Sequence, residues 1–226
     1  MRFVDVFLNF EIMSRALPML MRGLWNTVLL GASTIVLGTI FGVLVALARL
    51  YAWKPLRLLA VFYIDIVRAM PVLVLLILIY FALPFAGRAF ALDPFPAALL
   101  TLTLAMAAYT AEVARAGIQA VPKGQFEASA ALGLSFWTTL RKVILPQALR
   151  LVIPPHVSNC VSVVKDTALA TVVTMPELMR QAQDAQALFA NPSPLIGAAA
   201  IYVILLWPLV RFTAWLEARA MRAQAR

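Results

Sequence analysis

The stretch Glu127-Ala-Ser-Ala-Ala-Leu-Gly-Leu-Ser-Phe-Trp-Thr-Thr-Leu-Arg-Lys-Val-Ile-Leu-Pro146 is basic, helix-forming and only half apolar, in a chain that is otherwise mostly apolar. Of the 226 residues, 63% are hydrophobic and only 13% are charged, which is not the composition of a soluble domain. Several runs without a charged residue exceed the roughly 18 residues that cross a bilayer as a helix, which favours helices over a β-barrel. The quoted stretch therefore separates membrane spans on its two sides and lies outside the bilayer itself.

The sequence predicts an all-α membrane protein with five transmembrane helices. The predicted spans cover about residues 23–47, 58–83, 96–117, 146–175 and 194–215. Proline and charged residues interrupt the second span around Pro71 and the fourth around Pro154-Pro155. The polar segment 176–190 is rich in helix formers and is expected to be an external helix.

The spans divide the chain into three parts. Residues 1–20 are expected to form an interfacial helix or a tail, because Phe3, Val4, Phe7, Phe10 and Met13 recur at roughly helical spacing. Residues 21–217 form the transmembrane domain, with the polar insert at about 120–146, and residues 218–226 form a basic tail.

Basic residues set the expected orientation of these spans. The first and third connections and the C-terminal tail carry most of them, namely Arg49, Lys54, Arg57, Arg115, Lys123, Arg141, Lys142, Arg150, Arg219, Arg222 and Arg226. By the positive-inside rule these segments face the cytoplasm, so the N-terminus is predicted outside and the C-terminus inside. The formal net charge of +9 is spread along loops, so it indicates topology and not a nucleic-acid surface.

The composition also excludes several kinds of site. One cysteine, Cys160, rules out an internal disulfide and a Cys-ligated metal site, and one histidine, His156, rules out a bis-histidine haem site within the chain. The sequence has neither a phosphate-binding G-x-x-x-x-G-K-[ST] loop nor a convincing catalytic triad or metal-ligand set. We therefore expect no ATP site, no metal and no enzymatic activity in this chain.

Six charged residues fall within or near the ends of predicted spans: Asp65, Arg68, Glu112, Arg115, Lys165 and Asp166. Such charges are costly in a bilayer unless they are paired or face water. The spacing of three allows ion pairs Asp65–Arg68 and Glu112–Arg115, whereas adjacent Lys165 and Asp166 must find different partners. They either hold helices together or line a transport path.

Polar residues cluster directly after Pro154-Pro155, where the two prolines are expected to kink or unwind the fourth span. The candidates for a polar path through the membrane are Arg68, His156, Ser158, Asn159, Cys160, Ser162, Lys165 and Asp166. The alternative is a proline-kinked helix whose polar side chains only satisfy freed carbonyl groups.

Several stretches resemble a known family. Glu127-Ala128-Ser129, three residues, Gly133, nine residues and Val143-Ile-Leu145-Pro146 resemble the EAA motif of ABC-importer permeases, E-A-A-x3-G-x9-I-x-L-P. Further motifs, at 63–71, 108–127, 144–150 and 165–167, resemble the polar amino-acid branch of that family, the His/Gln/Glu/Arg-type permeases. The resemblance covers about residues 20–217.

The resemblance implies a type I ABC importer permease in a bacterial inner membrane, with a periplasmic N-terminus and a cytoplasmic C-terminus. It implies an ATP-binding cassette ATPase dimer that binds ATP and Mg, a second permease subunit that is identical or homologous, and a periplasmic solute-binding protein. Membrane lipid surrounds such a chain and nucleic acid is not a partner. The chain itself is then expected to hold no cofactor.

In this family the EAA segment is a cytoplasmic coupling helix that docks on the ATPase. The residues that match this role are Glu127, Ala128, Gly133, Arg141, Leu145 and Pro146. Leu132, Leu134, Phe136 and Trp137 would supply an apolar anchor, and Gly133 a sharp turn. We call residues 120–146 the predicted coupling segment.

Two positions bear on the substrate, because Cys160 and Leu75 stand where similar permeases often carry Glu or Gln. Neither supplies a carboxylate, which favours a neutral or acidic amino acid, unless this subunit is the non-binding half of a heterodimer. Two other functions stay open: an ion-coupled secondary amino-acid carrier, and a non-transporting membrane assembly subunit.

Overall fold

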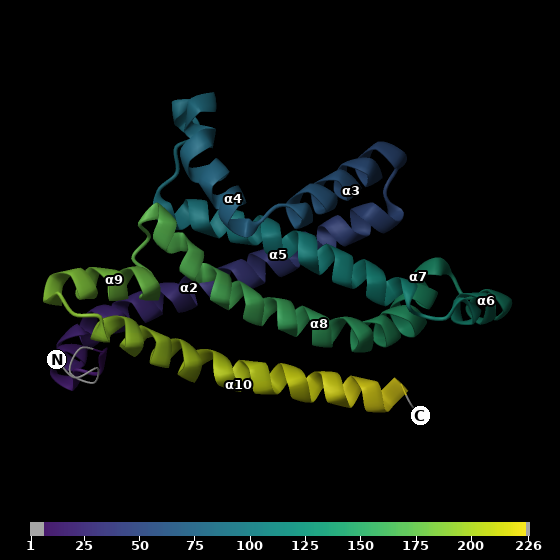
Figure 1. The fold of residues 1–226 in the computed structure, drawn as a ribbon. Coiled ribbons are helices and arrows are strands. Elements are labelled where there is room, and N and C mark those ends of the chain that lie inside the picture. The colour runs from purple at the N-terminus through teal and green to yellow at the C-terminus, as the bar shows by residue number, and fades with distance from the viewer. Residues whose placement is uncertain (1–6, 225–226) are drawn as a thin grey trace.

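The computed structural model describes residues 7–224, and every regular element in that range is helical (Figure 1). Four long helices, α2 (Phe10–Tyr51), α5 (Pro94–Gln119), α8 (Leu145–Asp166) and α10 (Ser193–Gln224), lie alongside one another. Phe3, Val4 and Arg226, which entered the predictions for the two termini, lie outside the described residues. Residues 10–20 belong to α2, the helix of the first predicted span.

Shorter elements connect the long helices. They are α3 (Lys54–Ala69), α4 (Val72–Ile77) with a π-helical turn Leu78–Ala82, the 3-10 turns Leu83–Ala86 and Arg88–Phe90, α6 (Lys123–Ala131), α7 (Phe136–Thr139) with a π-helical turn Leu140–Ile144, the 3-10 helix Thr167–Val173 and α9 (Leu178–Phe189). The helix predicted within 176–190 is thus present as α9.

Length and hydropathy single out α2, α5 and α10 as membrane spans among the described residues. The pair formed by Lys54–Ala69 and Val72–Ala86 qualifies as a fourth, bent by 107° at the break. The interruption predicted at Pro71 is therefore confirmed, and its cause is local: the ring of Pro71 disfavours helix at Met70, which is extended (ψ 134°). Helix α8 is not among these candidates, so a count of five spans stays a prediction.

Pro154 and Pro155 do not unwind the fourth predicted span. They lie within the continuous helix α8, which Figure 1 shows curved along its length. Of the two predicted alternatives, a kink or an unwound segment, the unwound segment is excluded, because neighbouring helices and local adjustments can satisfy carbonyl groups that proline frees within a bundle. The helical geometry changes at the two ends of α8, in the π-helical turn before it and the 3-10 helix after it.

Close backbone contact joins α2 to α5. A Cβ atom added at Gly38 would lie 2.6 Å from the Cβ of Met106, and one added at Gly42 would lie 2.5 Å from the Cβ of Thr110. Contacts this short leave no room for a side chain, so the glycine spacing G-x-x-x-G lets these two helices touch.

The amphipathic helix α9 packs against α2 and α10 at the end of the bundle where α2 begins (Figure 1). Its N-cap is Glu177, a fully buried residue whose carboxylate accepts hydrogen bonds from the backbone N–H groups of Met179 (2.8 Å) and Arg180 (2.7 Å). The Tyr202 hydroxyl of α10 donates a third bond to it (3.0 Å), and the backbone N–H of Leu178 donates to Thr27 Oγ1 of α2 (3.1 Å). These bonds fix α9 to two long helices.

Candidate functional site

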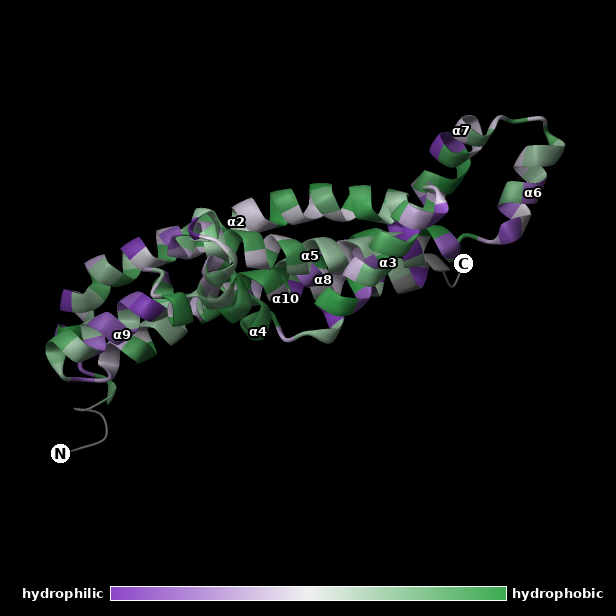
Figure 2. Cartoon of the chain, turned by 90° about the horizontal axis from the view of Figure 1, so that it is seen from above, coloured by the Kyte–Doolittle hydropathy of each residue, from purple (hydrophilic) through white to green (hydrophobic). Residues whose placement is uncertain are grey.

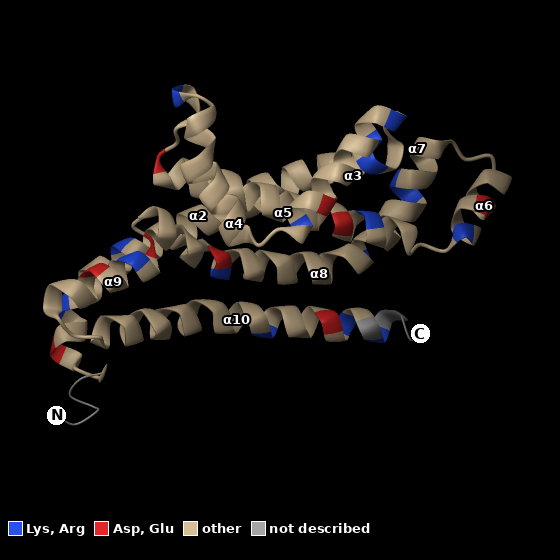
Figure 3. Cartoon of the chain, turned by 45° about the horizontal axis from the view of Figure 1, so that its top comes forward, with Lys and Arg blue, Asp and Glu red and all other residues tan. Residues whose placement is uncertain are grey.

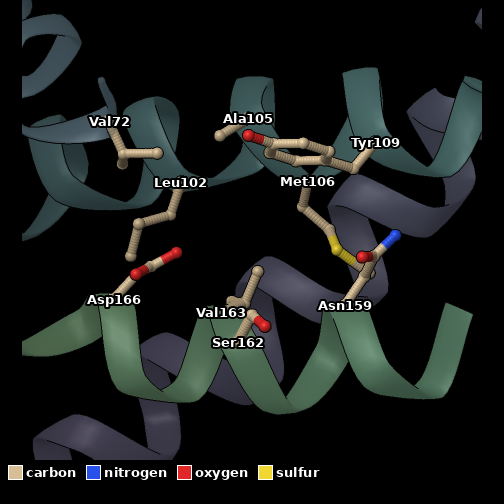
Figure 4. Close-up of a pocket in the computed structure, with 9 residues that line it drawn as sticks. All are labelled: Val72, Leu102, Ala105, Met106, Tyr109, Asn159, Ser162, Val163 and Asp166. Carbon is tan, nitrogen blue, oxygen red and sulfur yellow. The ribbon is translucent and has the colours of Figure 1, made fainter. Parts of the chain in front are cut away.

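A cavity of about 270 Å³ lies between α5 and α8, near the start of α4 (Figure 4). Its lining residues are Val72, Leu102, Ala105, Met106, Tyr109, Asn159, Ser162, Val163 and Asp166. Three of the predicted path residues, Asn159, Ser162 and Asp166, therefore share one hollow, because a spacing of three and four places them on one face of α8.

The polar groups are distributed along this cavity. Figure 4 shows the Asp166 carboxylate toward the Val72 and Leu102 end and the Asn159 amide toward the Tyr109 end, with Ser162 between them. No ion pair to Asp166 occurs within residues 7–224. The arrangement is that of a small ligand site, with apolar walls and a few polar groups that can orient a bound molecule.

A cation stands next to this cavity. The guanidinium carbon of Arg68 lies 5.9 Å from the centre of the Tyr109 ring, which lines the cavity. Arg68 is thus adjacent to the cavity without being part of its lining.

The structure places the remaining path candidates elsewhere. His156 faces α2, with Nε2 3.2 Å from Thr39 Oγ1. The Ser158 hydroxyl donates to Glu217 of α10 (3.0 Å), and Lys165 is exposed. Cys160 is partly buried and, like Leu75, is not among the residues that line the cavity.

Sequence reasoning missed the wall that α5 contributes. Leu102, Met106 and Tyr109 follow one another at spacings of four and three, the pattern of a single helix face. That periodicity was visible in the sequence, but it did not indicate whether this face of α5 packs toward α8 or toward lipid.

The predicted coupling segment projects beyond the bundle as two short helices joined by a loop, residues 132–135 (Figure 2). Gly133 has φ +69°, a left-handed conformation that favours glycine. The N–H of Leu134 donates to the carbonyl of Ser129 (3.0 Å) and the N–H of Gly133 to that of Ala130 (2.9 Å), which is a Schellman motif closing α6. The sharp turn predicted at Gly133 is therefore present.

The segment presents its motif residues to the surroundings. All six, namely Glu127, Ala128, Gly133, Arg141, Leu145 and Pro146, are exposed. Leu132 is 78% exposed and Trp137 75%, and Leu134 and Phe136 are also exposed. An apolar patch of this kind on a projecting turn is typical of a surface that binds a protein partner or a membrane.

An ion-pair cluster lies where the predicted coupling segment meets the bundle. Glu112 of α5 accepts hydrogen bonds from Arg49 of α2 (2.7 Å) and from Arg115, and Arg68 of α3 lies 3.9 Å from it. The predicted Glu112–Arg115 pair is confirmed, whereas the predicted Asp65–Arg68 pair is wrong: Asp65 is exposed and Arg68 turns to Glu112. Arg68 therefore pairs with Glu112, on the neighbouring helix α5, and not with Asp65 on its own helix.

A contact between two aromatic rings joins the end of α2, close to Arg49 in the sequence, to the predicted coupling segment. Tyr51, at the end of α2, packs edge-on against Phe136 of α7, with ring centres 5.7 Å apart. A small hydrophobic cluster formed by Val121, Leu140, Ile144 and Ala148 packs the segment against the ends of α5 and α8.

Comparison with known proteins agrees with this geometry. The chain is 40% identical over 167 residues to the L-cystine transport system permease protein TcyB of Bacillus subtilis (strain 168), covering 74% of this chain and 70% of that protein. It is 34% identical over 197 residues to the glutamine transport system permease protein GlnP of Escherichia coli (strain K12), covering 87% and 90%.

A solved structure has the same fold. The crystal structure of an amino acid ABC transporter with histidines superposes with a TM-score of 0.84 at 33% identity, over 92% of this chain and 96% of that one. Residues 38–222 match the family model described as binding-protein-dependent transport system inner membrane component. The chain is therefore a membrane protein and belongs to the family of binding-protein-dependent transport system inner membrane components.

Proposed function

We propose that this chain is the permease subunit of an ATP-driven importer for a polar amino acid, and that it couples transport to a separate ATPase through residues 120–146. The observation that carries the proposal is the projecting turn at Gly133, with its exposed apolar patch, in a chain whose sequence lacks a phosphate-binding loop. The relatives named above act in amino-acid transport, which supports the same class of substrate.

The partners follow from this role. An ATP-binding cassette dimer, holding ATP and Mg, docks on the coupling segment. A second permease subunit completes the path, and a periplasmic binding protein delivers the substrate on the side of α9. The complex belongs in a bacterial inner membrane, with the basic ends of α2, α8 and α10 on the cytoplasmic side.

The cavity between α5 and α8 is the proposed stopping place of the substrate. Asp166 is the acceptor for the α-ammonium group that all amino acids carry, and Arg68 lies near enough to the Tyr109 end to attract a carboxylate. Because no second carboxylate lines the cavity, a cationic side chain lacks a counter-charge there. This supports a neutral or acidic amino acid.

The experiment is uptake of labelled amino acids into proteoliposomes that contain the permease, its ATPase and the binding protein. We expect uptake to require ATP and to persist when ion gradients are collapsed. Uptake that follows an ion gradient without ATP would indicate a secondary carrier, and a complex that hydrolyses ATP without any uptake would indicate an assembly subunit.

A substitution then tests the cavity. Asp166→Asn should lower uptake at least tenfold while the complex still assembles and hydrolyses ATP, because it removes the charge that holds the ammonium group. Asp184→Asn makes the same chemical change at a half-exposed position of α9, away from the cavity lining; it is the matched control and should leave uptake unchanged.

A further inference from the structure

A second hollow lies between α8 and α10, on the other side of α8 from the cavity described above. It has a volume of about 450 Å³ and is lined by Arg150, Ile153, Pro154, Leu216, Arg219 and Ala220. A smaller hollow of about 270 Å³ adjoins it on α10, lined by Trp215, Ala218, Arg219 and Arg222. Arg219 lines both, so the two form one groove, which we call the α8–α10 groove.

The groove gathers positive charge that nothing in the described chain neutralises. Arg150, Arg219 and Arg222 are exposed, and none of them makes an ion pair with an acid between residues 7 and 224. The acid closest in sequence, Glu217, accepts the hydroxyl of Ser158 and is not part of the lining. A ligand for this groove therefore carries negative charge.

The walls and flank of the groove are apolar. Ile153, Pro154 and Leu216 form its walls. Toward the middle of α10, Phe212 is stacked on Trp215, and the exposed side chains continue with Val210, Trp207, Ile204 and Val203. Only 11% of the most apolar window of α10 is buried within the chain. A ligand with an anionic head and a long apolar body fits both parts of the surface.

The level of the groove along the helix suits a lipid headgroup. The guanidinium group of Arg219 lies over the ring of Trp215, and its carbon is 5.3 Å from the ring centre. Tryptophan and arginine together at the end of an apolar helix are typical of the boundary between hydrocarbon and water. Basic pockets between membrane helices at this boundary hold phospholipid head groups.

We propose that the α8–α10 groove binds one anionic phospholipid, with Arg150 and Arg219 as ligands of its phosphate and an acyl chain along the exposed face of α10. A soluble phosphate would not use the apolar walls, and a zwitterionic lipid would leave the surplus positive charge unmet. The bound lipid ties the beginning of α8, which follows the coupling segment directly, to α10. The inference depends on α10 lying in a bilayer and not on the direction or substrate of transport.

The test uses the intact permease–ATPase complex in nanodiscs of phosphatidylcholine in which the mole fraction of brominated lipid is increased stepwise from a small value. Bromine quenches nearby tryptophan, and the signal of Trp215 is obtained as the difference from Trp215→Phe. We expect brominated phosphatidylglycerol to quench Trp215 at lower mole fraction than brominated phosphatidylcholine. The preference for phosphatidylglycerol should fall about tenfold in the double variant Arg150→Gln, Arg219→Gln. Each arginine near a lipid phosphate is expected to contribute a factor of at least about three to that preference, and the two factors multiply.

The matched control is Lys54→Gln, Arg57→Gln, which removes the same charge from exposed positions at the start of α3. It should keep the preference, and elution of each variant as an intact complex establishes that it is folded. Equal quenching by the two lipids overturns the proposal, as does a preference that the control loses as well. Displacement of phosphatidylglycerol by inorganic phosphate would assign the site to a soluble anion, and absence of quenching by either lipid would assign this face to a protein contact; both results overturn it.

Discussion

The α6 end and the α9 end of the bundle each depend on one carboxylate that joins several helices, but the two are held by different partners. Glu112 is surrounded by Arg49, Arg68 and Arg115, and its side chain is still 21% exposed. Acidic and basic positions lie close together where α3 and α5 meet (Figure 3). Glu177 is fully buried and is held by two backbone N–H groups and a phenol, with no cation in ion-pair contact within the described chain.

The difference between ion pairs at Glu112 and buried hydrogen bonds at Glu177 indicates which end of the bundle can rearrange. Ion pairs that water reaches can exchange partners at small cost, and Arg68, at 3.9 Å, already stands beside the carboxylate as a third partner. Hydrogen bonds to a buried carboxylate cannot be replaced by water, so losing one leaves an unsatisfied group. The α6 end is therefore adjustable, which suits the coupling role proposed for it, and the α9 end is fixed.

The largest expected effect comes from Glu112→Gln, which leaves Arg49 and Arg115 without their shared counter-charge. We expect a loss of about 2 kcal/mol in the stability of the complex, below the range for a deeply buried pair because Glu112 is partly exposed. Thermal unfolding of the assembled complex measures it. Glu11→Gln is the control, since it removes an exposed Glu11–Arg15 pair and should change nothing; equal losses would show that the cluster is no more than a surface pair.

The second effect is on the α9 end. Glu177→Ala removes the N-cap and should cost about 1–2 kcal/mol locally, so amide hydrogen exchange within α9 should accelerate roughly tenfold. Asp184→Ala breaks the half-exposed Arg180–Asp184 pair on the same helix and should leave exchange nearly unchanged. If the two variants exchange alike, the buried cap does not fix this end.

A third substitution sharpens the description of the α6 end. Gly133→Ala places a Cβ atom in open space but at φ +69°, which costs about 1 kcal/mol of backbone strain. We expect a severalfold loss of ATP-dependent uptake with normal membrane insertion. Gly124→Ala also points into open space, within helix α6, and should transport normally. Wild-type uptake by both variants would mean that the turn geometry does not matter for coupling.

The smallest effect is a pH dependence confined to the α9 end. Burial raises the pKa of Glu177 above its ordinary value of 4.5, and the two cap bonds and Tyr202 offset only part of that. Since the folded protein then holds the proton more tightly than the unfolded chain does, α9 docking weakens as the pH rises from 4.5 through the raised pKa. Amide exchange in α9, corrected for its intrinsic pH dependence, should slow when the pH falls into that interval, and Glu177→Gln should remove the trend.

Local features of this fold could be predicted from the sequence, and features that depend on neighbours could not. Pro71 and Gly133 act on their own backbone, so the break and the turn they cause were predictable. Helical spacing accounts for the shared face of Asn159, Ser162 and Asp166, but the sequence grouped these three with five other polar candidates and did not separate them. The partner of Arg68 and the orientation of Ser158 depend on which helix lies opposite. The spacing of residues within one helix does not reveal which helix that is.

The contact of α2 with α5 at Gly38 and Gly42 limits how the protein can move. No methyl group fits between these helices, and α8 meets α5 equally closely near its beginning, where a Cβ atom added at Gly117 would overlap with Cγ2 of Val152. Farther along, from Asn159 to Asp166, α8 borders the cavity against α5. The bundle therefore combines a closely packed block, α2 with α5 and the beginning of α8, with a second half of α8 that has free volume beside it. If residues 120–146 couple the chain to an ATPase as proposed, the work delivered there is expected to displace the second half of α8, and the closely packed block is the frame against which it moves.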